Sequence, residues 1–209
     1  FIASVLLLEH PDGLTDLQKQ ERLYFVLKFQ QVTGPVMAKG LEDTAFYRFY
    51  PLASLNEVGG DPTFPGIPAE QFHRYNGEKM VAWPYSMSAT ATHDTKRGED
   101  MRARLNVLSE IPEEWNQAIG RWHSLNEPYR VELEGESDAV PDGNEEYLLY
   151  QTLVGTFPLE TGAQEIPPQY TDRIVAYMDK AVKEAKLRTS WNNPDEKHDD
   201  AIAAFVRAV

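Results

Sequence analysis

The sequence predicts a mainly α-helical chain with two short strand candidates. Several stretches repeat apolar residues with the 3.6-residue period of an amphipathic helix. Apolar residues make up 42% of the 209 positions and charged residues 25%, the ordinary range for a globular chain. Two short strands cannot form a stable sheet by themselves, so this combination indicates part of an α/β architecture.

The N-terminal part begins with a mainly apolar run of eight residues and has no initiator Met. This run is too short to cross a bilayer and has no basic region before it, so we predict neither a signal peptide nor a membrane span. We expect the chain to be a piece of a longer protein. Residues 14–32 follow the helical period, Thr15 and Gln18 have the spacing of a capping box, and Gly34-Pro35 predicts the end of that helix.

The middle part contains both strand candidates. Residues 35–39 are a short apolar run closed by Gly40, and residues 87–92 are short and rich in hydroxyl groups. Between them, residues 40–67 have the Gly, Pro, Asn and Asp content of a long loop. Loops of that length are uncommon in compact domains unless they are functional or inserted, so we expect one of these two roles. Residues 69–81 are weakly helical.

The C-terminal part predicts five helices, at residues 96–108, 112–125, 145–156, 171–187 and 194–208. Pro112 is well placed as the first residue of the second of these. The last two carry clear apolar stripes, at Ile174, Met178, Ala181, Val182 and Ala185 and at Ile202, Phe205, Val206 and Val209. The acidic stretch at residues 132–143 is predicted to be a solvated, mobile loop.

Charge and composition exclude several functional classes. The chain has 20 Lys and Arg against 33 Asp and Glu, a net charge of −13, which argues against nucleic acid and against anionic membrane surfaces as partners. The absence of cysteine excludes disulfides, thiol catalysis and cysteine-ligated metals, and is compatible with the cytoplasmic location that we predict. The five histidines lack metal-ligand spacing, and no nucleotide-binding motif is present, so we predict neither metal nor cofactor.

The densest polar cluster lies at residues 92–100, after a predicted strand and before a predicted helix. Sites are built at such strand ends in α/β architectures. Asp94 could stabilise developing positive charge, such as that of an oxocarbenium-like carbon, and His93 could hydrogen-bond a hydroxyl group. Lys96 and Arg97 could keep Asp94 ionised. The alternative is a structural one, in which Asp94 caps the helix N-terminus and the acidic residues 99 and 100 favour the helix dipole.

Two further groups of residues are weaker candidates. Lys39 and Glu42 lie in a charged cluster that follows the first strand candidate, where a salt-bridged turn is the alternative interpretation. The aromatic rings suited to stacking on sugars are Tyr47, Phe49, Tyr50, Trp83 and Tyr85, and their alternative role is core packing. Residue chemistry alone therefore supports an acidic helical protein with a candidate polyol or sugar site.

Several segments resemble the maltooligosyltrehalose synthases, a family of the α-amylase superfamily (glycoside hydrolase family 13) of (β/α)8-barrel enzymes. The most specific is Ser-Ala-Thr-Ala-Thr-His-Asp-Thr-Lys-Arg-Gly-Glu-Asp-Met-Arg-Ala-Arg-Leu at residues 88–105. The other matching segments, in order along the chain, are residues 33–48, 55–62, 108–110, 146–155, 180–186 and 189–191. A His-Asp pair alone is common in the superfamily, whereas the ordered set is specific.

The resemblance implies an activity and a set of roles. The family converts the reducing-end α-1,4 linkage of a maltooligosaccharide into an α,α-1,1 linkage by retaining, intramolecular transglycosylation, a trehalose-forming isomerisation. It implies that Asp94 is the transition-state-stabilising aspartate and that His93 contacts substrate. Lys39, Glu42, Tyr47, Lys96 and Arg97 are then candidate substrate-binding residues.

The resemblance also implies a division of the chain. We expect residues 1–95 to be a late barrel segment with a long loop and two short strands, and residues 96–209 to be a helical insertion. The nucleophile and the general acid/base of the family have no counterpart in these 209 residues. We therefore expect the chain alone to be inactive and the remainder of a parent chain to be its partner.

Two alternatives to a catalytic part remain open. One is a non-catalytic helical module for structure or maltodextrin binding, inherited from such an enzyme. The other is a protein-interaction module that uses the acidic residues 110–146.

Overall fold

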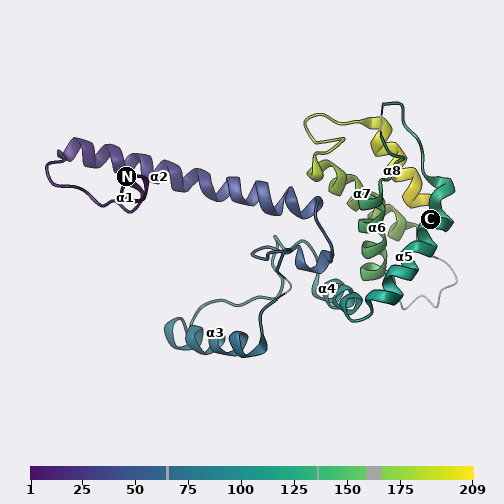
Figure 1. Ribbon diagram of the computed structural model, residues 1–209, viewed down its shortest axis with the longest axis horizontal. Helices are drawn as coiled ribbons and strands as arrows, with labels where there is room; N and C mark the ends of the chain where they lie inside the picture. The colour runs from purple at the N-terminus through teal and green to yellow at the C-terminus, as the bar shows by residue number, and fades with distance from the viewer. Residues whose placement is uncertain (65, 136, 159–165) are drawn as a thin grey trace. The chain divides into compact units, whose positions relative to one another are not determined.

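The computed structural model describes residues 1–64, 66–135, 137–158 and 166–209, and the regular secondary structure in these ranges is almost entirely helical (Figure 1). The only β pairing in them is an isolated antiparallel bridge between Val131 and Val140. The mainly α prediction is therefore confirmed. The helices are α1 Ile2–Leu6, α2 Asp16–Met37, α3 Ala69–Ala82, α4 Glu99–Asn106, α5 Pro112–Asn126, α6 Gly143–Thr156, α7 Pro168–Ala185 and α8 Glu196–Ala208.

Both strand predictions are wrong. Residues 35–39 continue α2 and enter a π-helical turn at Ala38–Glu42, and residues 87–92 have no regular secondary structure. A strand needs a hydrogen-bonding neighbour, and the described ranges offer none to either segment. The predicted break at Gly34-Pro35 is also wrong, because α2 runs through Pro35 to Met37.

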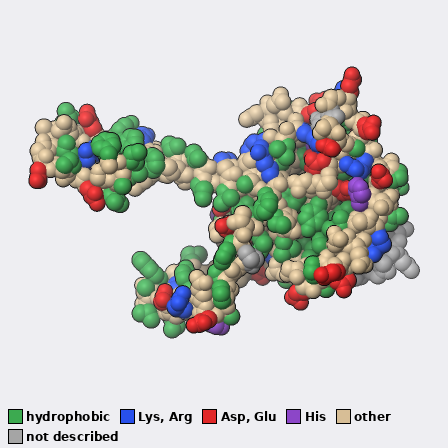
Figure 2. Space-filling model, in the orientation of Figure 1, with side chains coloured by type: hydrophobic (Ala, Val, Ile, Leu, Met, Phe, Trp, Pro, Cys, Tyr) green, Lys and Arg blue, Asp and Glu red, His purple; other side chains and the backbone are tan. Residues whose placement is uncertain are grey.

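The chain divides into two compact units, Phe1–Asp43 and Thr44–Val209. In the first unit, the predicted capping box is confirmed, since the Gln18 amide donates to Thr15 Oγ1 and the Thr15 amide donates to Gln18 Oε1. Val26 is the one buried residue of α2. Figure 2 shows hydrophobic side chains along the outside of this helix. The division predicted at residue 95 separates a barrel segment from a helical region of the parent fold. The two compact units do not test that division, so it stays a prediction.

The core of the second unit lies among α6, α7 and α8. The predicted stripes of α7 and α8 are buried, together with Leu148 and Leu149 of α6, except for Val209, which follows α8 and is exposed. Met178, Ile202 and Phe205 are each at most 2% exposed. Burying such side chains contributes about 1.5–3 kcal/mol each, so this contact holds the C-terminal helices together. None of the helices in the described ranges is long and apolar enough to cross a membrane.

A polar network joins the N-terminus of α6 to the start of α8. Asp142 caps α6, and Glu145 closes the capping box. The Glu145 carboxylate also accepts from the ring of the fully buried His198, over 3.0 Å between Oε1 and Nε2. Arg188 Nη1 lies 3.3 Å from both Asp142 Oδ2 and Glu145 Oε2. The predicted acidic loop is therefore tied to the core at its C-terminal end, where Val140 is completely buried.

The long loop predicted at residues 40–67 is also anchored. Gln151 of α6 is fully buried, accepts from the Ala53 amide over 2.7 Å and donates to the Tyr50 carbonyl over 3.1 Å. Asn56 is buried and donates to the carbonyls of Phe46 and Phe49, each over 2.8 Å. These side chains replace the backbone pairing that regular secondary structure would supply. Side-chain hydrogen bonds, rather than strand pairing, therefore hold this loop together and attach it to α6.

Candidate functional site

Asp94 lies in an exposed turn immediately before α4. The turn is closed by hydroxyl groups, because Thr95 Oγ1 donates to the Thr92 carbonyl over 2.8 Å and the Asp94 amide donates to Thr92 Oγ1 over 3.3 Å. The Asp94 side chain is 71% exposed, and its Oδ2 lies 3.4 Å from Nε2 of His93. The sequence thus brings these two predicted side chains together at the surface.

The structural alternative for Asp94 is wrong. The N-cap of α4 is Gly98, four residues further along the chain, and its side chain offers no acceptor to the helix. The acidic residues Glu99 and Asp100 do occupy the first turn of α4, where they favour the helix dipole. The Asp94 carboxylate is therefore not a helix cap.

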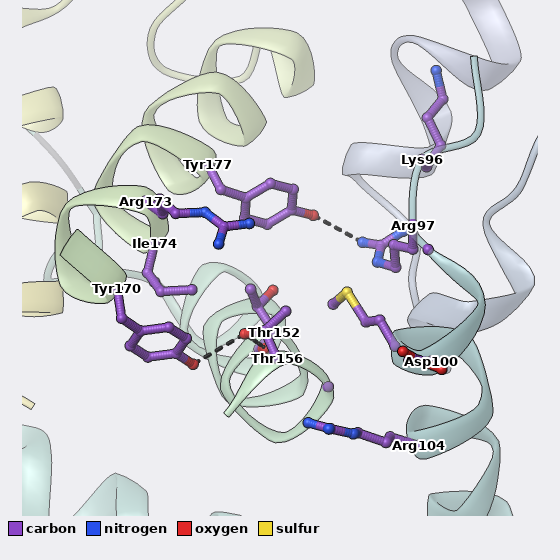
Figure 3. A pocket seen from close by; sticks show the side chains of 13 residues that line it. Lys96, Arg97, Asp100, Arg104, Thr152, Thr156, Tyr170, Arg173, Ile174 and Tyr177 are labelled. Carbon is purple, nitrogen blue, oxygen red and sulfur yellow. Dashed lines mark hydrogen bonds between the residues drawn. The ribbon is translucent and has the colours of Figure 1, made fainter. Parts of the chain in front are cut away.

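Lys96 and Arg97 are fixed through their backbones by Glu57. One carboxylate oxygen of Glu57 accepts from the Lys96 amide over 2.7 Å, and the other accepts from the Arg97 amide over 3.2 Å. The Arg97 side chain is only 6% exposed and donates from Nη2 to the Tyr177 hydroxyl of α7 over 2.8 Å. Figure 3 shows the Arg97 and Tyr177 side chains pointing toward each other.

A cavity of about 450 Å³ lies beside this pair, between the start of α4 and helices α6 and α7 (Figure 3). Its charged lining consists of Lys96, Arg97, Arg104 and Arg173, with Asp100 as the acidic member. Hydroxyl groups of Thr156 and Tyr170, 3.0 Å apart, face it from α6 and α7. Guanidinium, ammonium and hydroxyl groups donate hydrogen bonds, so this lining suits oxygen-rich ligands.

The other predicted binding residues lie elsewhere. Lys39 and Glu42 belong to the π-helical turn of the first compact unit, where Lys39 forms an ion pair with Asp43. Tyr47 belongs to the second unit and is 7% exposed within the hydrophobic core. Its burial favours the packing role that the sequence left open, and a substrate contact by Tyr47 stays a prediction. Among the other aromatic candidates, Trp83 and Tyr85 are 70% and 98% exposed.

Sequence reasoning did not identify Glu57 or Tyr177 as part of this region. Glu57 lies in one of the segments that resemble the family, but its partners are 39 and 40 residues away, and no local pattern indicates such a contact. Tyr177 lies on α7 between residues of the apolar stripe and has no motif of its own. The described residues contain no group of three or more His, Asp or Glu side chains that could hold a metal ion.

Comparison with known proteins identifies the relatives of the chain. No family model matches it. A curated protein of Mycobacterium tuberculosis, assigned as a maltooligosyl trehalose synthase, is 37% identical over 183 residues, which are 88% of this chain and 22% of that protein. This chain is homologous to part of the maltooligosyl trehalose synthases.

Solved structures agree with this relationship to the maltooligosyl trehalose synthases. A crystal structure of a maltooligosyl trehalose synthase superposes with a TM-score of 0.75 at 34% identity, over 93% of this chain and 25% of that one. The enzyme of Arthrobacter ramosus gives 0.72 at 36% identity, over 87% and 21%. A hypothetical maltooligosyl trehalose synthase of Sulfolobus tokodaii gives 0.73 at 30% identity, over 99% and 29%. The resemblance seen in the sequence is confirmed, and the chain spans about a quarter of the length of these relatives.

Proposed function

We propose that this chain is part of an isomerase that converts the reducing-end α-1,4 linkage of a maltooligosaccharide into an α,α-1,1 linkage. The observation that carries the proposal is the 37% identity to a protein assigned to that activity, together with an exposed His93-Asp94 pair in the most specific motif. In this proposal Asp94 is a catalytic residue that stabilises the transition state, and His93 contacts the substrate. Lys39, Glu42, Tyr47, Lys96 and Arg97 are the substrate-binding candidates.

The chemistry explains why a carboxylate is needed at this position. Retaining transfer passes through transition states in which the anomeric carbon carries positive charge, and a fixed negative charge nearby lowers their energy. The nucleophile and the acid/base, which attack the anomeric carbon and move the proton of the glycosidic oxygen, would come from the remainder of the larger protein. An ionised Asp94 would then act by charge alone.

The remainder of the larger protein is also the proposed partner of the exposed apolar side chains. In α2, Phe25, Leu27 and Phe29 are between 43% and 56% exposed, and α3 has no buried residue. Large exposed apolar surfaces mark places where protein contacts protein.

The test is Asp94→Asn in the full-length protein that contains this chain. Asparagine has nearly the same shape but no charge, so we expect kcat for isomerisation of maltopentaose to fall by about 100- to 1,000-fold or more. Asp200→Asn is the matched control, because Asp200 is an exposed acid of α8 outside the candidate site, and it should keep near-normal turnover. The 209-residue chain alone, assayed for loss of reducing ends, should be inactive.

Two results would contradict the proposal. Near-normal turnover in Asp94→Asn would reject the catalytic assignment. A full-length protein that binds maltopentaose without isomerising it would favour the alternative of a non-catalytic maltodextrin-binding module.

A further inference from the structure

Glu57 is a partly buried residue whose carboxylate contacts several backbone amides. Its two oxygens accept from three backbone amides, those of Val58, Lys96 and Arg97, over 2.9, 2.7 and 3.2 Å. Hydrogen bonds to an ionised acceptor are roughly twice as strong as those between neutral groups. Two of the three amides lie 39 and 40 residues further along the chain, so the carboxylate joins two separate loops.

The loop that carries Glu57 is itself held in place. Next to it, the buried Asn56 bonds the carbonyls of Phe46 and Phe49. The Gly60 amide donates to the Glu57 carbonyl over 2.7 Å. A Cβ atom at Gly60 would lie 2.9 Å from the carbonyl oxygens of both Leu55 and Glu57, so the turn is too tight for any larger residue without movement. Glu57 therefore extends from a well-defined backbone.

A second contact joins the end of the Asp94 turn to α7 through Arg97. The Arg97 side chain is buried and donates to the Tyr177 hydroxyl, while the Arg97 amide donates to Glu57. The polypeptide is thus fixed from two directions at residues 96 and 97, directly after His93 and Asp94, whose side chains are exposed. Because the Asp94 side chain is largely exposed, the backbone next to it determines the point from which its carboxylate extends.

We infer that Glu57 is a positioning residue for Asp94, an inference that rests on the function proposed above. The carboxylate fixes the peptide groups two and three residues after Asp94, and so sets where the Asp94 charge lies relative to the anomeric carbon. Catalytic groups must be held closely, and misplacement by about 1 Å can cost about 100-fold in rate. Glu57 touches neither substrate nor reacting atoms in this role.

The first test is kinetic and uses the full-length protein. Glu57→Gln keeps the size of the side chain but loses the charge and one acceptor oxygen. We expect kcat for isomerisation of maltopentaose to fall by about 10- to 100-fold while KM changes by less than about threefold. Glu57→Asp, which keeps the charge, should recover part of that loss. Glu114→Gln, at an exposed acid of α5, is the matched control and should behave like the wild type.

A double-mutant cycle separates positioning from general destabilisation. If Glu57 acts through Asp94, then Glu57→Gln should reduce the residual kcat of Asp94→Asn by less than about threefold, because the charge to be positioned is already absent. A purely structural loss would reduce both backgrounds equally. Equal reductions, or a wild-type kcat in Glu57→Gln, would overturn the inference.

The second test does not depend on catalysis. Backbone amide hydrogen exchange, measured in the full-length protein on peptides that contain residues 96 and 97, should be at least about tenfold faster in Glu57→Gln than in Glu114→Gln. Unchanged exchange would overturn the inference even if the proposed function holds. Exchange could also be faster in Glu57→Gln while Asp94→Asn keeps full turnover. That result would show that Glu57 holds the amides of residues 96 and 97 but that the proposed function is wrong.

Discussion

The α6–α8 core and the Asp94 turn are held by different means. In the core, side chains of three helices bury one another, and Met178, Ile202 and Phe205 are almost completely enclosed. In the turn, the candidate catalytic side chain is 71% exposed and its position depends on the hydrogen bonds of neighbouring backbone amides. The core is therefore held by buried apolar side chains, whereas the candidate catalytic residue lies in an exposed turn held by hydrogen bonds.

The N-terminal unit extends the contrast. Helix α2 is longer than α7, yet it buries one residue where α7 buries five. The helix predicted at residues 14–32 is present, but the predicted apolar periodicity does not give it an apolar face: its apolar side chains are spread around the helix, so one packing partner cannot bury them all. Phe25 and Phe29 stack on each other, with ring centroids 6.2 Å apart, and both remain substantially exposed. Replacing a buried phenylalanine of the second unit should therefore lower the free energy of unfolding far more than replacing an exposed one of the first unit.

The largest expected effect is that of Phe205→Ala on the stability of the 209-residue chain. Phe205 is 1% exposed in the core, so its removal leaves a cavity among α6, α7 and α8. We expect the free energy of unfolding in urea to fall by about 3–5 kcal/mol. Phe25→Ala is the matched control, because Phe25 is 53% exposed, and it should change the free energy by less than about 0.5 kcal/mol. Comparable losses in the two variants would break the contrast between core and N-terminal unit.

The features that could be predicted from the sequence are those whose partners are close together along the chain. The stripes of α7 and α8 were recognisable because an amphipathic helix that packs on one side must repeat its apolar residues every 3.6 positions. The capping box at Thr15 was recognisable because its two partners are three residues apart. Asp94 was recognisable through a motif that resembles a known family. Each of these signals is local in the sequence.

The features that sequence reasoning missed depend on distant partners. The strand predicted at residues 87–92 failed because strand formation depends on a neighbour that a local pattern cannot reveal. Helix α2 passes through Pro35 and continues into a π-helical turn, which the Gly34-Pro35 pair did not indicate. The Glu57 contact joins residues about 40 positions apart. Local patterns therefore indicated Asp94 but not the residues proposed to position it.

A smaller effect is expected for Gly60→Ala, which tests whether the turn that carries Glu57 is rigid. The new methyl group would lie 2.9 Å from two backbone oxygens, so the loop must shift. We expect a loss of about 1–3 kcal/mol in the free energy of unfolding, measured in urea. Gly120→Ala, on α5 where a Cβ would meet nothing within 4 Å, is the control and should not destabilise the chain. Wild-type stability for Gly60→Ala would show that the turn is loose and would weaken the case for Glu57.

The smallest expected effect is a pH dependence of the polar network that joins α6 and α8. Burial acts to lower the pKa of His198, but the hydrogen bond and negative charge of Glu145 outweigh it and raise that pKa above its usual 6.5. Burial likewise acts to raise the pKa of Glu145, but its bonds with His198 and the Asp142 amide, helped by Arg188, lower that pKa below its usual 4.5. The charged pair is therefore favoured in the folded state.

The signs of the two shifts define a pH window. The His198 contribution to stability is fully present below pH 6.5 and is lost as the pH rises through the raised folded-state pKa. The Glu145 contribution is present above pH 4.5 and is lost as the pH falls through the lowered one. We expect the stability difference between the wild type and His198→Gln to be largest between pH 4.5 and 6.5 and to shrink toward about pH 9. Urea unfolding at about pH 5.5 and about pH 9 measures it, with the exposed His73→Gln as the control. Any loss of packing in His198→Gln is the same at both pH values, so a difference that does not change with pH would mean that the buried His198 is held by shape alone.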